Sequence, residues 1–171
     1  MEKQTVQKYI GIVKEQQDAL RVGEGFCSNC AWELGQIVVK TAKEKYAPVS
    51  IRIDIDGVTV FYYLMKGTSL DNDWWMKKKL NGCLKTGDSS FMNFLTISAS
   101  ENEDAHPWVK DVGNFAAVGG CFPLYADSGV LKGYIMVSGL PHEKDHQLIV
   151  DSLSEFLEVS VPTVLDGDGD F

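Results

Sequence analysis

The chain has 171 residues, of which 44% are hydrophobic and 23% charged, proportions typical of one globular domain with its own core. Its formal net charge of −8 argues against nucleic acid and anionic membranes as partners, because both attract basic surfaces. Charges run through the first helix-length segment, and no apolar run reaches the roughly 20 residues of a membrane helix. We therefore expect a cytoplasmic protein whose four cysteines are reduced.

The hydrophobic pattern predicts five helices and two hairpins. Helices follow from apolar residues spaced three and four apart, and strands follow from apolar residues at alternate positions. Turns at Asp56-Gly57 and Asp127-Ser128-Gly129 join the strands of each hairpin. In chain order, the predicted ranges are helix 3–20, helix 28–46, strands 49–55 and 58–65, helix 70–85, helix 89–98, strands 116–125 and 130–138, and helix 143–157.

Strands joined by hairpins pair antiparallel, so the predicted fold class is α+β, with helices packed against an antiparallel sheet. The second strand, residues 58–65, is apolar almost throughout and is predicted to lie in the centre of the sheet. Residues 99–113 are polar and are predicted to form a loop. We expect one domain over residues 1–161 and an acidic tail over residues 162–171.

The segment His142-Glu143-Lys144-Asp145-His146 matches H-E-x-x-H, in which two histidines one helical turn apart bind zinc and the glutamate is a general base. A proline precedes the motif directly, so the motif falls on the first turn of its helix. A third ligand would have to come from the same short helix. We interpret the segment as a polar helix start with acids near its positive end, and we expect no metal site.

The segment Cys27-Ser28-Asn29-Cys30 is a C-x-x-C motif, which occurs in thiol redox centres and in zinc sites. A thioredoxin-like centre requires a strand before the helix, and a zinc site requires two further ligands. The other two cysteines are isolated in the sequence. We interpret Cys27 and Cys30 as part of the buried face of the second helix, and the redox and zinc alternatives stay open.

Three segments are not explained by helix or strand patterning alone. Residues 70–79 hold a tryptophan pair beside three lysines. The pair Gly119-Gly120 lies inside a predicted strand, where glycines mark the close approach of a ligand or of another backbone. Residues 137–146 lead from a strand end into a helix N-terminus, which is a common geometry for binding anions.

In their order and spacing, these segments resemble the haem-degrading domain family, the HbpS- and GlcG-like proteins, and in particular a small uncharacterised branch of it. The resemblance covers roughly residues 26–157. It rests on a helix motif, a serine pair, a glycine pair, and a strand end that is followed by Asp-His. The matching residues are Asp71, Asn72, Trp75, Lys78, Lys79, Ser89, Ser90, Gly119, Gly120, Val137, Ser138, Gly139, Leu140, Asp145 and His146, with a partial match at Ala31, Trp32, Leu34 and Gly35.

The resemblance implies a profilin-like fold, an antiparallel sheet of about five strands flanked by helices on both faces. It also implies a homo-oligomer built from homodimers, and some relatives bind haem. Relatives often carry histidine directly before the glycine pair, where this chain has Val118. Because valine neither ligates iron nor moves a proton, haem is one candidate ligand among other small anionic molecules.

The function hypothesis that these residues favour is an oligomeric, non-enzymatic protein that binds a small ligand. Trp75 would supply an apolar wall, and Lys78 and Lys79 would meet an anionic group of the ligand. Ser138 and the helix start near His146 would add hydrogen bonds. The same helix could instead form a subunit interface, where tryptophan is enriched. The predicted ligand-binding residues are Asp71, Asn72, Trp75, Lys78, Lys79, Ser89, Gly119, Gly120, Ser138 and His146.

Two other classes of function stay open. An enzyme that acts on haem or on a small metabolite would use His146 beside Asp145 as acid and base, although the sequence shows no set of nucleophile, base and orienting group. A protein-interaction module would need an exposed apolar patch outside the oligomer interface.

Overall fold

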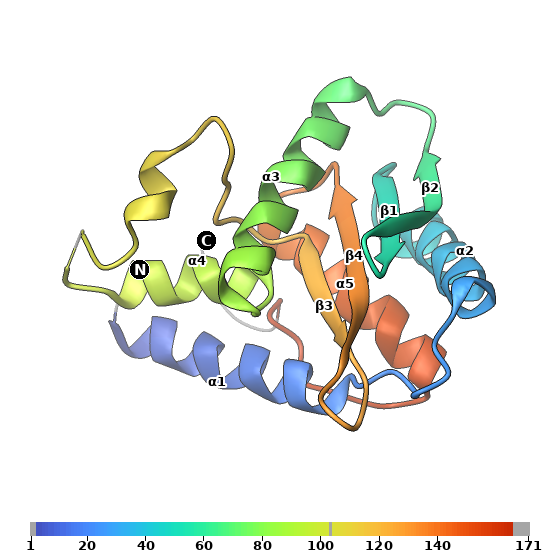
Figure 1. Ribbon diagram of the computed structural model, residues 1–171, viewed down its shortest axis with the longest axis horizontal. Coiled ribbons are helices and arrows are strands. Elements are labelled where there is room, and N and C mark those ends of the chain that lie inside the picture. Colours follow the sequence, from blue (N-terminus) through green and yellow to red (C-terminus); the bar gives the residue numbers. More distant parts are fainter. Residues whose placement is uncertain (1–2, 103, 166–171) are drawn as a thin grey trace.

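The computed structural model describes residues 3–102 and 104–165, and over these ranges it shows five α-helices, a short 3-10 helix and an antiparallel sheet of four strands (Figure 1). The helices are α1 (Lys3–Ala19), α2 (Ser28–Lys45), α3 (Leu70–Thr86), α4 (Ser90–Ala99), η1 (Pro107–Lys110) and α5 (His142–Leu157). The strands are β1 (Ser50–Ile55), β2 (Val58–Leu64), β3 (Cys121–Tyr125) and β4 (Leu131–Ser138). The predicted α+β class and the helices on both faces of the sheet are confirmed.

The sheet has the strand order β2-β1-β4-β3, and each neighbouring pair is antiparallel. One face is covered by α2 and α5, and the other face is covered by α3 (Figure 1). Successive side chains of β1 point to opposite faces of the sheet. Ile51 and Ile53 point into the core under α2 and α5. Arg52 and Asp54 point toward α3 and form a bidentate ion pair, with nitrogen–oxygen distances of 2.8 and 2.7 Å.

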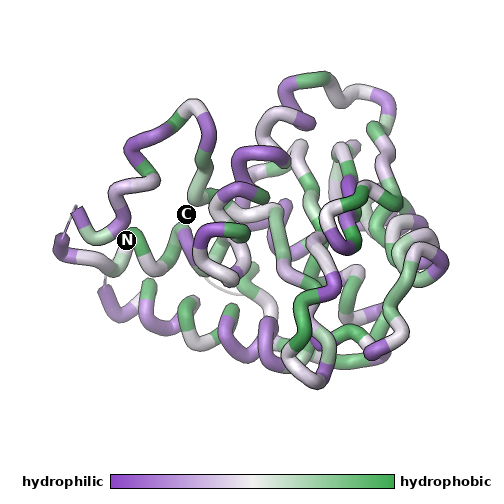
Figure 2. Tube along the Cα trace, viewed as in Figure 1, coloured by the Kyte–Doolittle hydropathy of each residue, from purple (hydrophilic) through white to green (hydrophobic). Residues whose placement is uncertain are grey.

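Three hydrophobic clusters hold the layers together. The main cluster joins the sheet to α2 and α5, a second joins α1 to α4, and a third lies between α3 and the sheet around Met76. Figure 2 shows hydrophobic and hydrophilic residues interleaved along α1, as expected for a helix with one buried face. The largest fully buried side chains are Tyr9, Phe91, Phe122, Leu20, Leu34, Ile51, Ile53, Met76, Leu95, Leu124, Ile135 and Met136.

The predicted helix and strand boundaries agree with the structure to within one residue, except that β3 begins at Cys121 rather than at residue 116. The predicted loop over residues 99–113 contains the short helix η1. One assignment within the sheet is wrong: β2 is an edge strand and not a central one. Its side chains Val58, Tyr62 and Tyr63 remain exposed. Because the consecutive residues Tyr62 and Tyr63 point to opposite faces, the edge strand is incompletely covered on both faces.

The resemblance implied about five strands, and the described part of the chain has four. Val22 forms a single parallel bridge to Ala126 beside β3, and its N–H donates to the carbonyl of Tyr125 at 2.9 Å. Gly23 and Gly25 follow at once, so the pairing does not extend into a fifth strand.

The predicted acidic tail, residues 162–171, lies partly outside the described residues. Within its described part, Val164 is fully buried in the α1–α4 cluster, and its N–H donates to Gln147 Oε1 at 2.9 Å. The chain therefore packs against the domain at least as far as Val164. In the residues that the structure describes, no helix is long and apolar enough to cross a membrane.

Candidate functional site

Two adjoining hollows lie beside α3. The larger has a volume of about 650 Å³ and is lined mainly by apolar side chains of α3, α4 and residues 109–118. The smaller has a volume of about 330 Å³ and lies where α3, the end of β4 and the start of α5 meet. Trp75 and Val118 line both hollows, and we call the combined site the Trp75 cleft. Volumes of this size suit small-molecule ligands.

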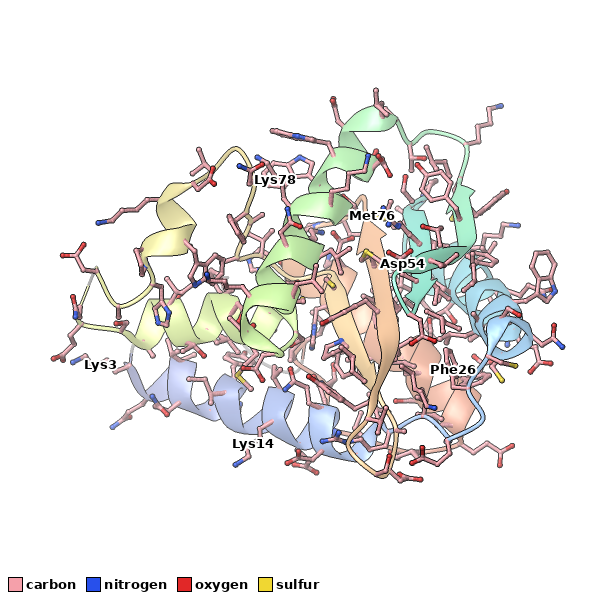
Figure 3. All side chains as sticks on the ribbon, viewed as in Figure 1. Lys3, Lys14, Phe26, Asp54, Met76 and Lys78 are labelled. Carbon is pink, nitrogen blue, oxygen red and sulfur yellow. The ribbon has the colours of Figure 1, made fainter. Side chains whose placement is uncertain are left out.

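The Trp75 cleft gathers half of the predicted binding residues. Asn72, Lys79 and Ser138 line the smaller hollow, Lys78 lines the larger, and Trp75 lines both. In Figure 3, Lys78 and Met76 extend from opposite sides of α3, with Met76 directed toward the sheet. The helical spacing of the α3 residues thus places one face on the core and another on the cleft.

Lys79 is nearly completely buried and forms the main polar contact of the smaller hollow. Its Nζ donates to Asp145 Oδ2 at 2.7 Å and to the carbonyl oxygen of Val137 at 3.0 Å. Both side chains of the ion pair are at most 3% exposed, so neither charge is compensated by solvent. Lys79 therefore connects α3 to β4 and α5, and the structure has already paired it with an internal anion.

Asp145 also satisfies the backbone at the start of α5. Its Oδ1 accepts a hydrogen bond from the N–H of Leu140 at 3.0 Å. Burial raises the pKa of Asp145 to about 6, and the nearby Lys79 ammonium opposes that rise. The helix start that the sequence predicted as an anion-binding geometry thus holds a carboxylate of the chain itself.

The pair Gly119-Gly120 lies against this ion pair. A Cβ atom on Gly120 would lie 2.5 Å from both Lys79 Nζ and the carbonyl oxygen of Val137, and Gly120 has a φ of +115°. A Cβ atom on Gly119 would collide with the carbonyl oxygen of His142. The predicted close approach at the glycine pair is therefore an approach of the chain to itself beside Lys79, and neither glycine lines the cleft.

Lys78 is held on the wall of the larger hollow by its neighbours. Its Nζ lies 3.5 Å from the centroid of the Trp74 ring and 5.2 Å from that of the Trp75 ring, and it donates to the carbonyl oxygen of Val112. An ammonium group has three donors, so Lys78 retains further hydrogen-bonding capacity beyond Val112. Its contact with the aromatic faces is a cation–π interaction.

Besides the two glycines, three predicted binding residues do not line the cleft. Ser89 is fully buried, and its Oγ caps α4 by accepting a hydrogen bond from the N–H of Met92 at 3.2 Å. Asp71 is exposed at the start of α3 and lines neither hollow. His146 is fully buried and lines neither hollow.

His146 packs against aromatic side chains and is shielded from solvent. Its ring stacks on Phe91 with centroids 4.8 Å apart, and its Nε2 lies 2.9 Å from Gln16 Oε1. Burial lowers the pKa of His146 to about 3, so the imidazole is neutral. The acid–base role considered for His146 would require contact with a ligand, and the burial of this ring prevents such contact.

The two histidines of the H-E-x-x-H segment take different partners. His142 Nδ1 accepts from the N–H of Gly119 at 3.3 Å, whereas His146 is paired with Gln16. No group of three or more His, Cys, Asp or Glu side chains that could hold a metal occurs in the described residues.

The interpretation of the C-x-x-C segment as part of a buried helix face is wrong for Cys27, whereas Cys30 packs, partly buried, against the main hydrophobic cluster. Cys27 is exposed and Cys30 is partly buried, and their Sγ atoms lie 3.6 Å apart. Cys83 and Cys121 lie in the separate core under α3 and cannot complete a zinc site with the first pair.

Several residues that line the cleft were not among the predicted binding residues. Trp74 was visible as half of the tryptophan pair, and His142 was visible in its motif, but neither was assigned to the site. No sequence motif marks Phe94 of α4 or Val112 of the following loop as part of the cleft, because only the tertiary fold brings them beside Trp75.

The sheet between two helical layers, with a cleft at the start of α5, defines the class as a profilin-like α+β domain. The family model described as "Haem degrading protein HbpS-like" matches residues 26–154, which is more than half of the chain. The chain therefore belongs to the HbpS-like family, as the resemblance had indicated.

Individual relatives support this assignment. A UPF0303 protein of Psychromonas ingrahamii is 32% identical over 157 residues, which cover 92% of this chain and 96% of that protein. The crystal structure of the Ybr137w protein is similar with a TM-score of 0.78 at 26% identity, covering 87% of each chain. The structure of a PduOC:haem complex is similar with a TM-score of 0.61 at 20% identity, covering 82% of this chain and 99% of that one, and this likeness shows the fold.

Proposed function

We propose that this protein is a non-enzymatic binding protein for a small molecule with an apolar, planar body and a carboxylate group. The observation that carries the proposal is the Trp75 cleft, whose apolar walls include two half-exposed tryptophans beside the Lys78 ammonium. Flat aromatic walls favour a planar ligand, and a lysine with spare donors favours a carboxylate. The haem held by the structurally similar PduOC domain is one ligand of this chemical class.

The anionic group of the ligand is assigned to Lys78 rather than to Lys79. Lys79 is already neutralised by Asp145, and approach to it would require desolvating a buried ion pair. Lys78 has no carboxylate within ion-pair distance among the described residues. Asn72 and Ser138 in the smaller hollow supply neutral polar groups for the other end of the ligand.

The residues of the cleft do not fit a haem iron ligated by the protein. Of the side chains that commonly ligate haem iron, His142 is the only one among the described residues that lines the cleft. Because its Nδ1 accepts the Gly119 N–H, the neutral imidazole carries its proton on Nε2, which leaves that nitrogen without a lone pair for iron. We therefore propose that the cleft binds the planar apolar part of the ligand and its carboxylate, and we assign no role to iron.

The proposal is tested by titrating the full chain with metal-free protoporphyrin IX and with haemin, each followed by porphyrin absorbance. Because the contacts are to the macrocycle and its carboxylates, we expect saturable binding of both, with Kd values within about threefold of each other. Trp75→Ala should weaken both by at least about tenfold, which corresponds to about 1.4 kcal/mol.

Trp32→Ala is the matched control, since Trp32 is an exposed tryptophan of α2 on the opposite face of the sheet. Its Kd should equal that of the parent. Absence of saturable binding of either porphyrin, or equal loss in the Trp32 and Trp75 variants, would contradict the proposed site. Binding of haemin alone, abolished by His142→Ala, would show iron ligation and contradict the assignment to the ligand body.

A cytoplasmic location and a homo-oligomeric state belong to the same proposal. Exposed aromatic side chains gather along α2 and the edge strand β2, including Trp32, Tyr62 and Tyr63. Such a surface favours contact with a second copy of the chain. Light scattering at several protein concentrations measures the mass directly, and a monomer at every concentration would contradict the oligomer.

A further inference from the structure

Cys27 and Cys30 form an open thiol pair at the start of α2. Cys27 is the N-cap residue, with extended backbone angles of φ −142° and ψ −176°, and Cys30 lies in the first helical turn. Their Sγ atoms, 3.6 Å apart, are within hydrogen-bonding distance of each other. The Cys27 side chain is exposed and the Cys30 side chain is partly buried, so a reagent from solvent reaches Cys27 first.

The segment before the pair is anchored to the protein core. Phe26 is 7% exposed and packs edge-to-face on Phe156 of α5, with ring centroids 6.1 Å apart. Figure 3 shows Phe26 where the chain enters α2. Phe26 therefore fixes Cys27 at the helix start. On the other side of Phe26, a Cβ atom on Gly25 would meet no atom within 4 Å.

The surroundings of Cys27 favour its thiolate. The nearby backbone N–H groups of Cys30 and Asn29, followed by the Cys30 thiol, lower the pKa of Cys27, and burial and the Glu33 carboxylate oppose them. Backbone N–H groups at a helix start stabilise an anion, as they do in reactive cysteines generally. Exposure of Cys27 keeps the opposing cost of desolvation small.

We propose that Cys27 and Cys30 form a thiol–disulfide exchange site, with Cys27 as the attacking thiol, Cys30 as the resolving thiol, and a glutathione-type soluble disulfide as co-reactant. The site is separate from the Trp75 cleft and does not depend on ligand binding there.

Exchange proceeds in two balanced steps. The Cys27 thiolate attacks one sulfur of the soluble disulfide, the bond between its two sulfurs breaks, and a first thiolate leaves and takes a proton from solvent. Cys30 then loses its proton to solvent and attacks Cys27 Sγ, which breaks the mixed disulfide and releases a second thiol. The protein dithiol thus gives two electrons and, through solvent, two protons to the soluble disulfide, which becomes two thiols.

The other cysteine pair supplies an internal contrast. Cys83 and Cys121 are fully buried between α3 and the sheet, and burial raises the pKa of Cys121 well above its ordinary value. Thiols without solvent access or thiolate character react slowly with disulfides. Selective oxidation of the first pair is therefore expected in the folded protein.

The test equilibrates the folded full chain with buffers of reduced and oxidised glutathione, then blocks the remaining thiols and digests with trypsin. Cys27 and Cys30 lie in one tryptic peptide, residues 22–40, so a peptide with their disulfide carries no blocking group and is two hydrogens lighter than the unblocked dithiol. We expect this disulfide to form as the oxidised fraction rises, while Cys83 and Cys121 stay reduced. No disulfide in this peptide even in fully oxidised glutathione, or oxidation of the buried pair first, would overturn the proposal.

Two single variants test the assigned order of attack. Cys30→Ser should accumulate a stable mixed disulfide between Cys27 and glutathione, because the resolving thiol is absent. Cys27→Ser should form mixed disulfide at Cys30 at least about tenfold more slowly. Equal rates in the two variants, or no mixed disulfide in Cys30→Ser, would overturn the assignment, and Cys83→Ser should leave disulfide formation in the peptide unchanged.

Discussion

The helices α5 and α2 both begin near two glycines, and each has, in or beside its first turn, a titratable side chain close to backbone N–H groups. At α5 this side chain is Asp145, which is buried and paired with Lys79, and the pair Gly119-Gly120 packs against it. At α2 it is Cys27, which is exposed. The loop before α2 is open around its glycines, whereas the glycines at α5 have no room for a side chain.

The pKa values of Asp145 and Cys27 are shifted in opposite directions. Burial raises the pKa of Asp145 to about 6 even though Lys79 and backbone N–H groups favour the carboxylate. Backbone N–H groups lower the pKa of Cys27, where burial opposes them only weakly. The comparison teaches that desolvation, rather than the helix start itself, decides whether such a group is a structural anchor or a reactive one.

Breaking the buried pair at α5 should have the largest effect. Lys79→Ala leaves Asp145 buried without its partner, so we expect the free energy of unfolding to fall by about 3–5 kcal/mol, measured by urea denaturation. Lys40→Ala is the control, because Lys40 and Glu155 form an ion pair in which both side chains are about half-exposed, and its loss should cost less than about 1 kcal/mol. Similar losses in both variants would contradict the role of Lys79 as an anchor.

The glycines near the two helix starts should respond differently to a methyl group. Gly120→Ala places Cβ against Lys79 and Val137 at a φ of +115°, so we expect a loss of about 1–3 kcal/mol in unfolding free energy. Gly25→Ala meets no atom within 4 Å of its Cβ, and its effect should stay within about 0.5 kcal/mol. Equal effects at both positions, in the same urea experiment, would show that packing does not distinguish the two helix starts.

The burial of His146 should make the α5 region sensitive to acid. Its pKa in the folded state, about 3, lies below the ordinary 6.5, so between these values the unfolded chain binds a proton that the folded chain does not. This contribution to stability is complete above pH 6.5 and is lost as the pH falls. We expect the stability of the parent to fall more steeply than that of His146→Asn, approaching a difference of about 1.4 kcal/mol per pH unit. Parallel pH profiles from urea denaturation would contradict this.

The exposed start of α2 should tolerate substitution. Cys27→Ser replaces a thiol with a good N-cap side chain and removes no buried contact. We expect the melting temperature to change by less than about 4 °C, measured by circular dichroism. A larger drop would show that Cys27 is a structural residue and would weaken its distinction from Asp145.

The local pattern of the sequence was sufficient for most of the fold. Helix and strand boundaries depend on periodicity and on breakers such as Pro48, which are visible within a few residues. The position of β2 in the sheet was not predictable in this way, because Tyr62 and Tyr63 read as apolar whether they face a core or solvent.

The site was predictable only in part. The helical spacing of α3 places Asn72, Trp75 and Lys79 beside one hollow. Their partners were not visible, since Asp145 lies 66 positions after Lys79 and Gln16 lies 130 positions before His146. Burial of His146 arises from such distant contacts, which no local pattern encodes.

Binding at the Trp75 cleft is tested most directly by following the indole N–H signals of the four tryptophans by NMR while protoporphyrin IX is added. The macrocycle should shift the signals of Trp74 and Trp75 saturably and leave that of Trp32 in place. If Trp32 shifts most, or if no indole signal moves at saturating porphyrin, the cleft is not the binding site.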